Sequence, residues 1–218
     1  MRRFTGAALS AFSLVALPFV SPAKAQYRGA EPGAFDHFVL SLSWSPSYCA
    51  TEGSPRSVQC SRPYAFLLHG LWPQYEHGYP EFCPTNQPSR VPDSLARRYL
   101  DIIPSPGLIG HQWRKHGSCT GLTQEQYLQL SRRAMEAVAI PREFVLPSAP
   151  ILISPREVEE KFIAANPGLR PQQIAVTCDR RYLREVRICL SKDLKFTDCE
   201  WVNRNSCRLD RALMPPVR

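Results

Sequence analysis

Apolar and polar residues alternate over several short stretches of this chain, which is the pattern of β-strands with one buried face. Between Phe35 and Trp44 the apolar positions 38, 40 and 42 repeat at every second residue. The same period recurs at positions 186, 188 and 190, and a mostly apolar segment, 174–178, lies just before them. We therefore expect strands over 35–44, 174–178 and 184–190.

A further stretch, Tyr64–Leu68, is continuously apolar, as expected for a buried central strand. We expect this strand to end at His69, where Gly70 lets the backbone turn. A rigid strand that delivers a polar side chain at its tip is a common way to hold a catalytic group.

Three other segments carry helical signals. The first is 94–103. The second begins at Thr123–Gln126, which has the spacing of a capping box, and apolar residues then follow on one helical face at 127, 130, 134 and 138. The third begins at Ser154–Glu157, which has the same capping-box spacing with Pro155 in the first helical position, and it should run to 166–168.

Strands and helices that do not alternate regularly indicate an α+β fold, in which helices pack against a largely antiparallel central sheet. The 21 prolines fall mainly in loops, and the sequence contains no internal repeat. Because a domain holds about 100–200 residues, we expect one domain over residues 26–218.

The N-terminus has the features of a cleaved secretory signal peptide over residues 1–25. Arg2 and Arg3 precede an apolar stretch at 7–20, and Ala23–Ala25 supplies the small-residue cleavage pattern. The stretch is shorter than the ~20 residues that span a bilayer. We expect a periplasmic or secreted protein with no membrane anchor. Removing the leader takes the net charge from +8 to +5, which is compatible with a polyanionic partner but does not identify one.

Eight cysteines follow the leader, at positions 49, 60, 83, 119, 178, 189, 199 and 207. An even number of cysteines behind a signal peptide indicates disulfides formed in an oxidising compartment. Zinc sites need close ligand pairs such as C-x-x-C, and no two of these cysteines are that close. We therefore expect a disulfide-stapled fold that uses no metal and no cofactor.

Two segments carry most of the candidate chemistry. The first, 67–73, contains His69 beside Trp72, and the second, 111–119, contains His111, Lys115 and His116. Imidazole can both accept and donate a proton near neutral pH. Histidines with a lysine, and without an evident nucleophile, suit acid–base catalysis on an anionic substrate and favour phosphoryl transfer.

A helix over the second segment would gather its polar side chains. His111 and Lys115 would then be neighbours four residues apart, as would Gln112 and His116, while Trp113 turns toward the core. The spacing of five between the two histidines does not match the four-residue pair of a helical zinc site.

The strings His69–Pro73 and Trp113–Cys119 resemble the two signature segments of the ribonuclease T2 family of secreted RNA-cleaving enzymes. Their order, their separation and the cysteine that closes the second string all match the family. The resemblance covers the chain from about Phe35 to about Cys207 and implies a disulfide-stapled α+β fold.

The resemblance also implies a reaction, in which the 2′-hydroxyl of RNA attacks the adjacent phosphorus. It makes His116 the base and His69 the acid, with Lys115 stabilising the developing charge and His111 holding phosphate. The products are a 2′,3′-cyclic phosphate and a 5′-hydroxyl, and no metal is needed because the substrate supplies the nucleophile. DNA lacks that hydroxyl, so we expect RNA and not DNA as the substrate of a monomeric enzyme.

The chain departs from the family at Gln112, where the second signature usually has glutamate. An amide can donate hydrogen bonds to the phosphate but cannot share a proton with it, so this residue can change the rate or its pH range. Trp72 and Tyr75 are candidates for stacking on a base, although core packing explains Trp72 almost as well.

Eight cysteines allow 105 pairings. Cys49 and Cys60 bracket a polar loop and can close it locally, and Cys189 and Cys199 can clip a second loop with Cys178 and Cys207 paired around it. A bridge from Cys83 to Cys119 would join the two histidine segments. The last two arrangements are also those that the family resemblance suggests.

Two other functions are compatible with the same residues. One is a binding protein that kept the fold and lost efficient catalysis, with Gln112 as the altered residue. The other is a zinc hydrolase that uses His111 and His116.

Overall fold

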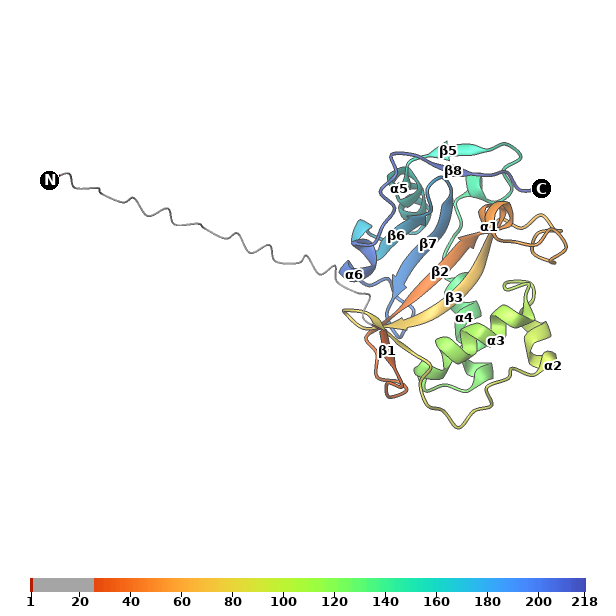
Figure 1. Cartoon of the computed structure of the whole chain (residues 1–218). Helices are drawn as coiled ribbons and strands as arrows, with labels where there is room; N and C mark the ends of the chain where they lie inside the picture. The colour runs from red at the N-terminus through yellow and green to blue at the C-terminus, as the bar shows by residue number, and fades with distance from the viewer. Residues whose placement is uncertain (2–25) are drawn as a thin grey trace.

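The computed structural model describes residue 1 and residues 26–218, so the predicted leader lies outside the described residues except for Met1. Its centre is a four-stranded sheet in the order β3-β2-β7-β6, in which every neighbouring pair is antiparallel. The strands are β2 His37–Trp44, β3 Phe66–Gln74, β6 Ile174–Cys178 and β7 Leu183–Leu190 (Figure 1).

The two faces of this sheet differ in character. Directly paired residues point to the same face, and the register places Phe38, Leu40 and Leu42 of β2 beside Leu190, Ile188 and Val186 of β7 on one face, where they join the main core. The opposite face carries the residues that alternate with these along each strand. Among these are Ser41, Ser43, Trp72, Glu185 and Arg187.

The helices are α1 Ser45–Thr51, α2 Asp93–Ala96, α3 Pro106–Lys115, α4 Gln124–Glu136, α5 Pro155–Ala165 and α6 Glu200–Asn203. α4 and α5 bury Tyr127 and Phe162 in the main core, so they cover the apolar face. Both predicted capping boxes are present, at Thr123 and Ser154.

Smaller elements complete the chain. β1 Gln26–Arg28 pairs in parallel with β4 Tyr79–Glu81, and β5 Ile151–Ile153 pairs with β8 Ala212–Met214. Short 3-10 turns lie at Arg97–Tyr99, Gly117–Thr120, Arg142–Phe144 and Pro171–Gln173. Within the part of the chain that the structure describes, no helix has the length and apolar character needed to cross a membrane.

The architecture confirms the α+β prediction, and β2, β6, β7, α4 and α5 lie within a few residues of the ranges expected for them. The expectation that the strand ends at His69 is wrong, because β3 continues through Gly70 to Gln74. The helix expected over 94–103 is shorter: α2 and a 3-10 turn end at Tyr99. The carbonyl of Ile102 instead accepts a hydrogen bond from Leu68 N at 3.1 Å, which ties this segment to β3.

Four disulfides join all eight cysteines, and they are the pairs expected from the sequence: Cys49–Cys60, Cys83–Cys119, Cys178–Cys207 and Cys189–Cys199. Cys83 follows β4, and Cys119 lies in the turn after α3. This bridge therefore holds the end of α3 against the segment that follows β3 and β4.

Candidate active site

His69 occupies an irregularity in β3. Ser41 of β2 pairs with Gly70 and Leu42 pairs with Leu68, so His69 is an extra residue without a partner on β2. Such a β-bulge redirects the side chains around it. Leu68 and Leu71 both remain in the core, whereas His69 and Gly70 between them both fall on the opposite face of the sheet, together with Ser41.

α3 supplies the second group of candidate residues. Ser105 caps the helix by accepting from Leu108 N at 3.2 Å, and the helix ends at Lys115 with His116 in the cap position. Trp113 is buried and donates its indole N–H to the carbonyl of Pro88 at 2.9 Å, as expected for the face turned toward the core.

The two histidine segments meet at one pocket with a volume of about 230 Å³. Its lining includes His69, Trp72, His111, Gln112, Lys115 and His116, all of which are candidates from the sequence. The other lining residues are Gln74, Tyr79, Arg187, Trp201, Val202 and Asn205. Tyr75 is not among them, because its half-buried side chain packs against the main core.

Trp72 connects the two imidazoles. Its ring is stacked on His116 with the centroids 5.3 Å apart, and it meets His69 edge-on at 5.1 Å. Its indole N–H donates to Oε1 of Gln112 at 2.7 Å. Any side chain at Gly70 would collide with Gln112 and with the indole nitrogen, so glycine is required for this contact.

His116 is set up to be neutral near neutral pH. Burial lowers its pKa well below the usual 6.5, and the nearby charges of Lys115, His69 and His111 act in the same direction. Among the described residues, its Nδ1 is buried and has no hydrogen-bond partner. A neutral imidazole beside cationic groups can accept a proton.

Lys115 gives the pocket positive charge, and His111 adds a second imidazole from α3. Lys115 Nζ lies 3.7 Å from Oε2 of the buried Glu81, whose Oε1 is also bound by Arg28 at 3.1 Å. The His111 side chain is largely exposed. The loss of part of its hydration, together with the charges of Lys115 and Arg114, lowers its pKa. Within the described part of the chain, no Asp or Glu side chain lines this pocket.

Glu185 and Arg187 of β7 were not identified from the sequence. Nδ1 of His69 is hydrogen-bonded to Oε1 of Glu185, and Arg187 binds the other carboxylate oxygen. Burial alone would raise the pKa of Glu185, but the contacts with His69 and Arg187 outweigh burial and lower it to about 2. The alternation of β7 implied that 185 and 187 share a face, but only the strand order reveals what they face.

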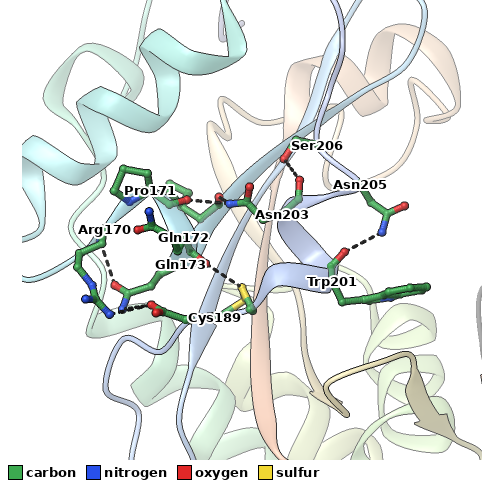
Figure 2. Close-up of a disulfide and its surroundings, with 12 residues drawn as sticks. Arg170, Pro171, Gln172, Gln173, Cys189, Trp201, Asn203, Asn205 and Ser206 are labelled. Atoms are coloured by element: carbon green, nitrogen blue, oxygen red, sulfur yellow. Dashed lines mark hydrogen bonds and ion pairs between the residues drawn. A yellow bond between two sulfur atoms is a disulfide. The ribbon is translucent and has the colours of Figure 1, made fainter.

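α6 forms another wall of the pocket that sequence reasoning missed. The Cys189–Cys199 disulfide ties its start to β7, and Asn203 Nδ2 donates to the carbonyls of Pro171 and Ile174 at 2.7 and 2.8 Å. Figure 2 shows Asn203 directed toward the segment 170–173, while Trp201 and Asn205 extend on the other side. Both of these reach the pocket.

Metal-ligand clusters are not a feature of this site. Across the residues that the structure describes, no three His, Cys, Asp or Glu side chains come together in a way that could hold a metal ion.

Comparison with known proteins identifies the family of this chain. The model of the ribonuclease T2 family matches residues 35–199. A ribonuclease of Aeromonas hydrophila is 36% identical over 172 residues, which cover 75% of each chain. Ribonuclease I of Escherichia coli strain K12 is 24% identical over 234 aligned residues, covering 86% of each chain.

Solved structures agree on the fold. The RNase-related protein from Calystegia sepium superposes with a TM-score of 0.67 at 20% identity, covering 84% of this chain and 98% of that one. RNase NT in complex with 5′-AMP superposes with a TM-score of 0.64 at 22% identity, covering 84% and 98%. The extent of the family match, together with the relative from Aeromonas, shows that this chain belongs to the ribonuclease T2 family and is an enzyme of the ribonuclease class.

Proposed function

We propose that this protein is an endoribonuclease that cleaves single-stranded RNA by metal-independent transesterification. The observation that carries the proposal is the convergence of His69 and His116, from two distant segments, on one pocket that also contains Lys115 and His111. Family membership supplies the substrate class, and the named residues supply the chemistry.

In the proposed first step, neutral His116 removes the proton of the 2′-hydroxyl. The 2′-oxygen attacks the adjacent phosphorus, and the bond to the 5′-oxygen breaks as protonated His69 delivers a proton to that oxygen. The products are a 2′,3′-cyclic phosphate and a free 5′-hydroxyl. Hydrolysis of the cyclic phosphate then uses the two histidines in exchanged roles.

The charges of the pocket support these roles. The lowered pKa of His116 keeps it unprotonated at neutral pH, as a base must be. Lys115 is placed to stabilise the crowded phosphorane oxygens, because a fixed cation acts strongly in a partly water-excluded site, and His111 is placed to hold phosphate by hydrogen bonding. The amide of Gln112, whose oxygen is bound by Trp72, keeps its NH₂ group available to donate to the same oxygens.

Aromatic residues of the pocket support nucleotide binding. Tyr79, Trp72 and Trp201 line it, and base stacking on an aromatic ring contributes about 1–3 kcal/mol. Much of Trp72 is already covered by His116 and by the guanidinium of Arg187, 5.2 Å from the ring centroid. The ability of RNase NT to bind 5′-AMP indicates that a nucleotide is a suitable ligand for this fold.

We further propose that the enzyme acts as a monomer in the periplasm or outside the cell. The four disulfides support an oxidising compartment. The leader features of residues 1–25 support export. We expect no cleavage of DNA, because the proposed reaction needs a 2′-hydroxyl.

One assay tests the proposal against its alternatives. The purified protein is incubated with single-stranded RNA in excess EDTA, and the ends of the products are analysed. Cleavage that leaves 2′,3′-cyclic phosphate and 5′-hydroxyl ends supports the proposal. Cleavage that EDTA abolishes would indicate a metal-dependent hydrolase, and binding without cleavage would indicate a protein that has lost catalysis.

A further inference from the structure

His69 makes a direct contact with a buried carboxylate that neither the sequence analysis nor the proposed mechanism uses. Oε1 of Glu185 is hydrogen-bonded to Nδ1 of His69. Oε2 of Glu185 accepts from Nε and Nη2 of Arg187 at 2.9 and 2.6 Å, and Thr177 Oγ1 approaches it at 3.5 Å. The carboxylate is therefore fixed from two sides.

This contact selects which ring nitrogen of His69 is available. An ionised carboxylate only accepts hydrogen bonds, so Nδ1 must carry the proton. Since the pKa of Glu185 is about 2, the carboxylate is ionised throughout the pH range in which imidazole titrates. The other nitrogen, Nε2, is left for the substrate.

The same contact fixes the orientation of the ring. Nδ1 carries a proton in both the neutral and the protonated imidazole, so the hydrogen bond to Glu185 holds His69 in place whichever form is present. His116 has different surroundings, since it is buried and close to cations. Two imidazoles in such different surroundings can take different roles as acid and base.

We propose that Glu185, held in place by Arg187, is the positioning residue that makes His69 the general acid. This inference rests on the proposed ribonuclease function and adds a residue to it. Glu185 does not line the histidine pocket; it lines a neighbouring pocket that His69 also lines, so the imidazole stands between the carboxylate and the histidine pocket. The helix α3 contributes an amide, Gln112, to the pocket. The carboxylate that contacts a pocket histidine is Glu185, and it comes from β7.

Other charged groups also act on His69, and the test must allow for them. They are His111 and Lys115 of α3, His116 at its C-terminal cap, Arg184 and Arg187 of β7, and Glu52 after α1. Glu185→Gln removes one charge and leaves all of these unchanged. The glutamine also keeps an oxygen that can accept from Nδ1–H, so the side chain remains close in shape.

The deciding experiment compares two substrates that differ in their leaving group. A dinucleoside phosphate releases a 5′-alkoxide, which needs a proton from the acid, whereas a nucleoside 3′-(4-nitrophenyl phosphate) releases a stable phenolate. Glu185→Gln should cleave the dinucleoside phosphate about 10–100-fold more slowly, the range seen when the partner that orients a metal-bound histidine is lost, and the nitrophenyl ester less than about 3-fold more slowly.

Glu159→Gln is the matched control. Glu159 is a half-buried carboxylate whose Oε1 accepts from Val176 N at 3.1 Å, and it does not line the pocket. This variant should cleave both substrates as the wild type does. Equal losses on both substrates in Glu185→Gln, or no loss on either, would overturn the inference while the wild-type activity still supports the proposed function. A wild type inert toward both substrates would overturn the proposed function and the inference with it.

A measurement on the wild-type protein avoids any effect of the substitution on folding. Nitrogen-15 NMR of the histidine rings, assigned with a His69 variant, reports which nitrogen carries the proton when the ring is neutral. Protonated Nδ1 in His69 is expected. A neutral His69 protonated on Nε2 would contradict the proposal directly.

Discussion

The two imidazoles of the pocket lie against the same indole but in opposite surroundings. His69 projects from a sheet and contacts a carboxylate, whereas His116 caps a helix, is buried and has cations as neighbours. Trp72 contacts both. Under the proposed mechanism, this difference suits His69 to the role of acid and His116 to the role of base.

The largest effect is expected when either imidazole is removed. His69→Ala and His116→Ala should each reduce RNA cleavage by about 10²–10⁴-fold, because neither water nor the other histidine can replace an acid or a base held in place. The initial rate on single-stranded RNA is the measurement, and circular dichroism checks that each variant is folded.

The two variants should also differ from each other. On a nitrophenyl ester, which needs no acid, His69→Ala should recover most of its activity and His116→Ala should not. Retention of more than about a tenth of the wild-type activity on RNA by either variant would contradict its assigned role.

Removing Cys83–Cys119 should lower both stability and activity, whereas removing Cys49–Cys60 should lower stability alone. Replacing Cys83 and Cys119 by serine removes a bridge between residues 36 positions apart and should lower the free energy of unfolding by about 4 kcal/mol. Because that bridge holds the end of α3, activity of the folded variant should also fall.

Cys49–Cys60 is the control for that experiment. It spans 11 positions and lines no part of the histidine pocket, so its removal should cost about 3 kcal/mol with activity unchanged. Denaturant unfolding and initial rates measure the two effects. Equal losses of activity in both variants would mean that the bridge to α3 has no special place in the site.

The surroundings of His116 and of Glu185 should lose stability over different ranges of acidic pH. The folded-state pKa of His116 is lowered, so its contribution to stability is present above pH 6.5 and decreases as pH falls below that value. The pKa of Glu185 is lowered from 4.5 to about 2, so its contribution is present above pH 4.5 and is lost between about 4.5 and 2.

The contribution of Glu185 to stability can be isolated by comparing the wild type with Glu185→Gln. The free energy of unfolding of the wild type minus that of Glu185→Gln should shrink by about 3 kcal/mol as pH falls through this interval. A difference that stays constant with pH would show that the carboxylate gains nothing from His69 and Arg187.

The smallest effect is expected at Gln112. Gln112→Glu introduces the residue that the family usually has, and its carboxylate could still accept from the Trp72 indole. The variant should cleave RNA a few-fold faster at mildly acidic pH, because a carboxyl group can share a proton with the phosphorane oxygens. A slower rate at every pH would mean that this pocket is adapted to the amide.

The sequence predicted the elements whose signals are local. The capping boxes at Thr123 and Ser154 mark helix starts because the bonds they describe lie within four residues. Gln112, Lys115 and His116 were placed on one helix for the same reason. The continuation of β3 beyond Gly70 was missed, because glycine is required there by Trp72 and Gln112, which approach from elsewhere in the chain.

Glu185 and Trp201 were missed because their relation to His69 depends on long-range order. β7 lies beside β2 and not beside β3, so no spacing along the chain indicates that Glu185 reaches His69. The position of α6 is set by Cys189–Cys199 and by Asn203. Tyr75 was chosen because it is close in sequence to Trp72, but the chain turns it toward the core.

The extra residue in β3 has a consequence for protein design. In a regular strand, placing Leu68 in the core and His69 outside would send Gly70 inward, Leu71 outward and Trp72 into the core. A designer who grafts this pair of histidines onto another sheet must therefore copy the irregularity along with the side chains. A graft that matches only residue identities would bury the indole and leave a leucine facing the phosphate.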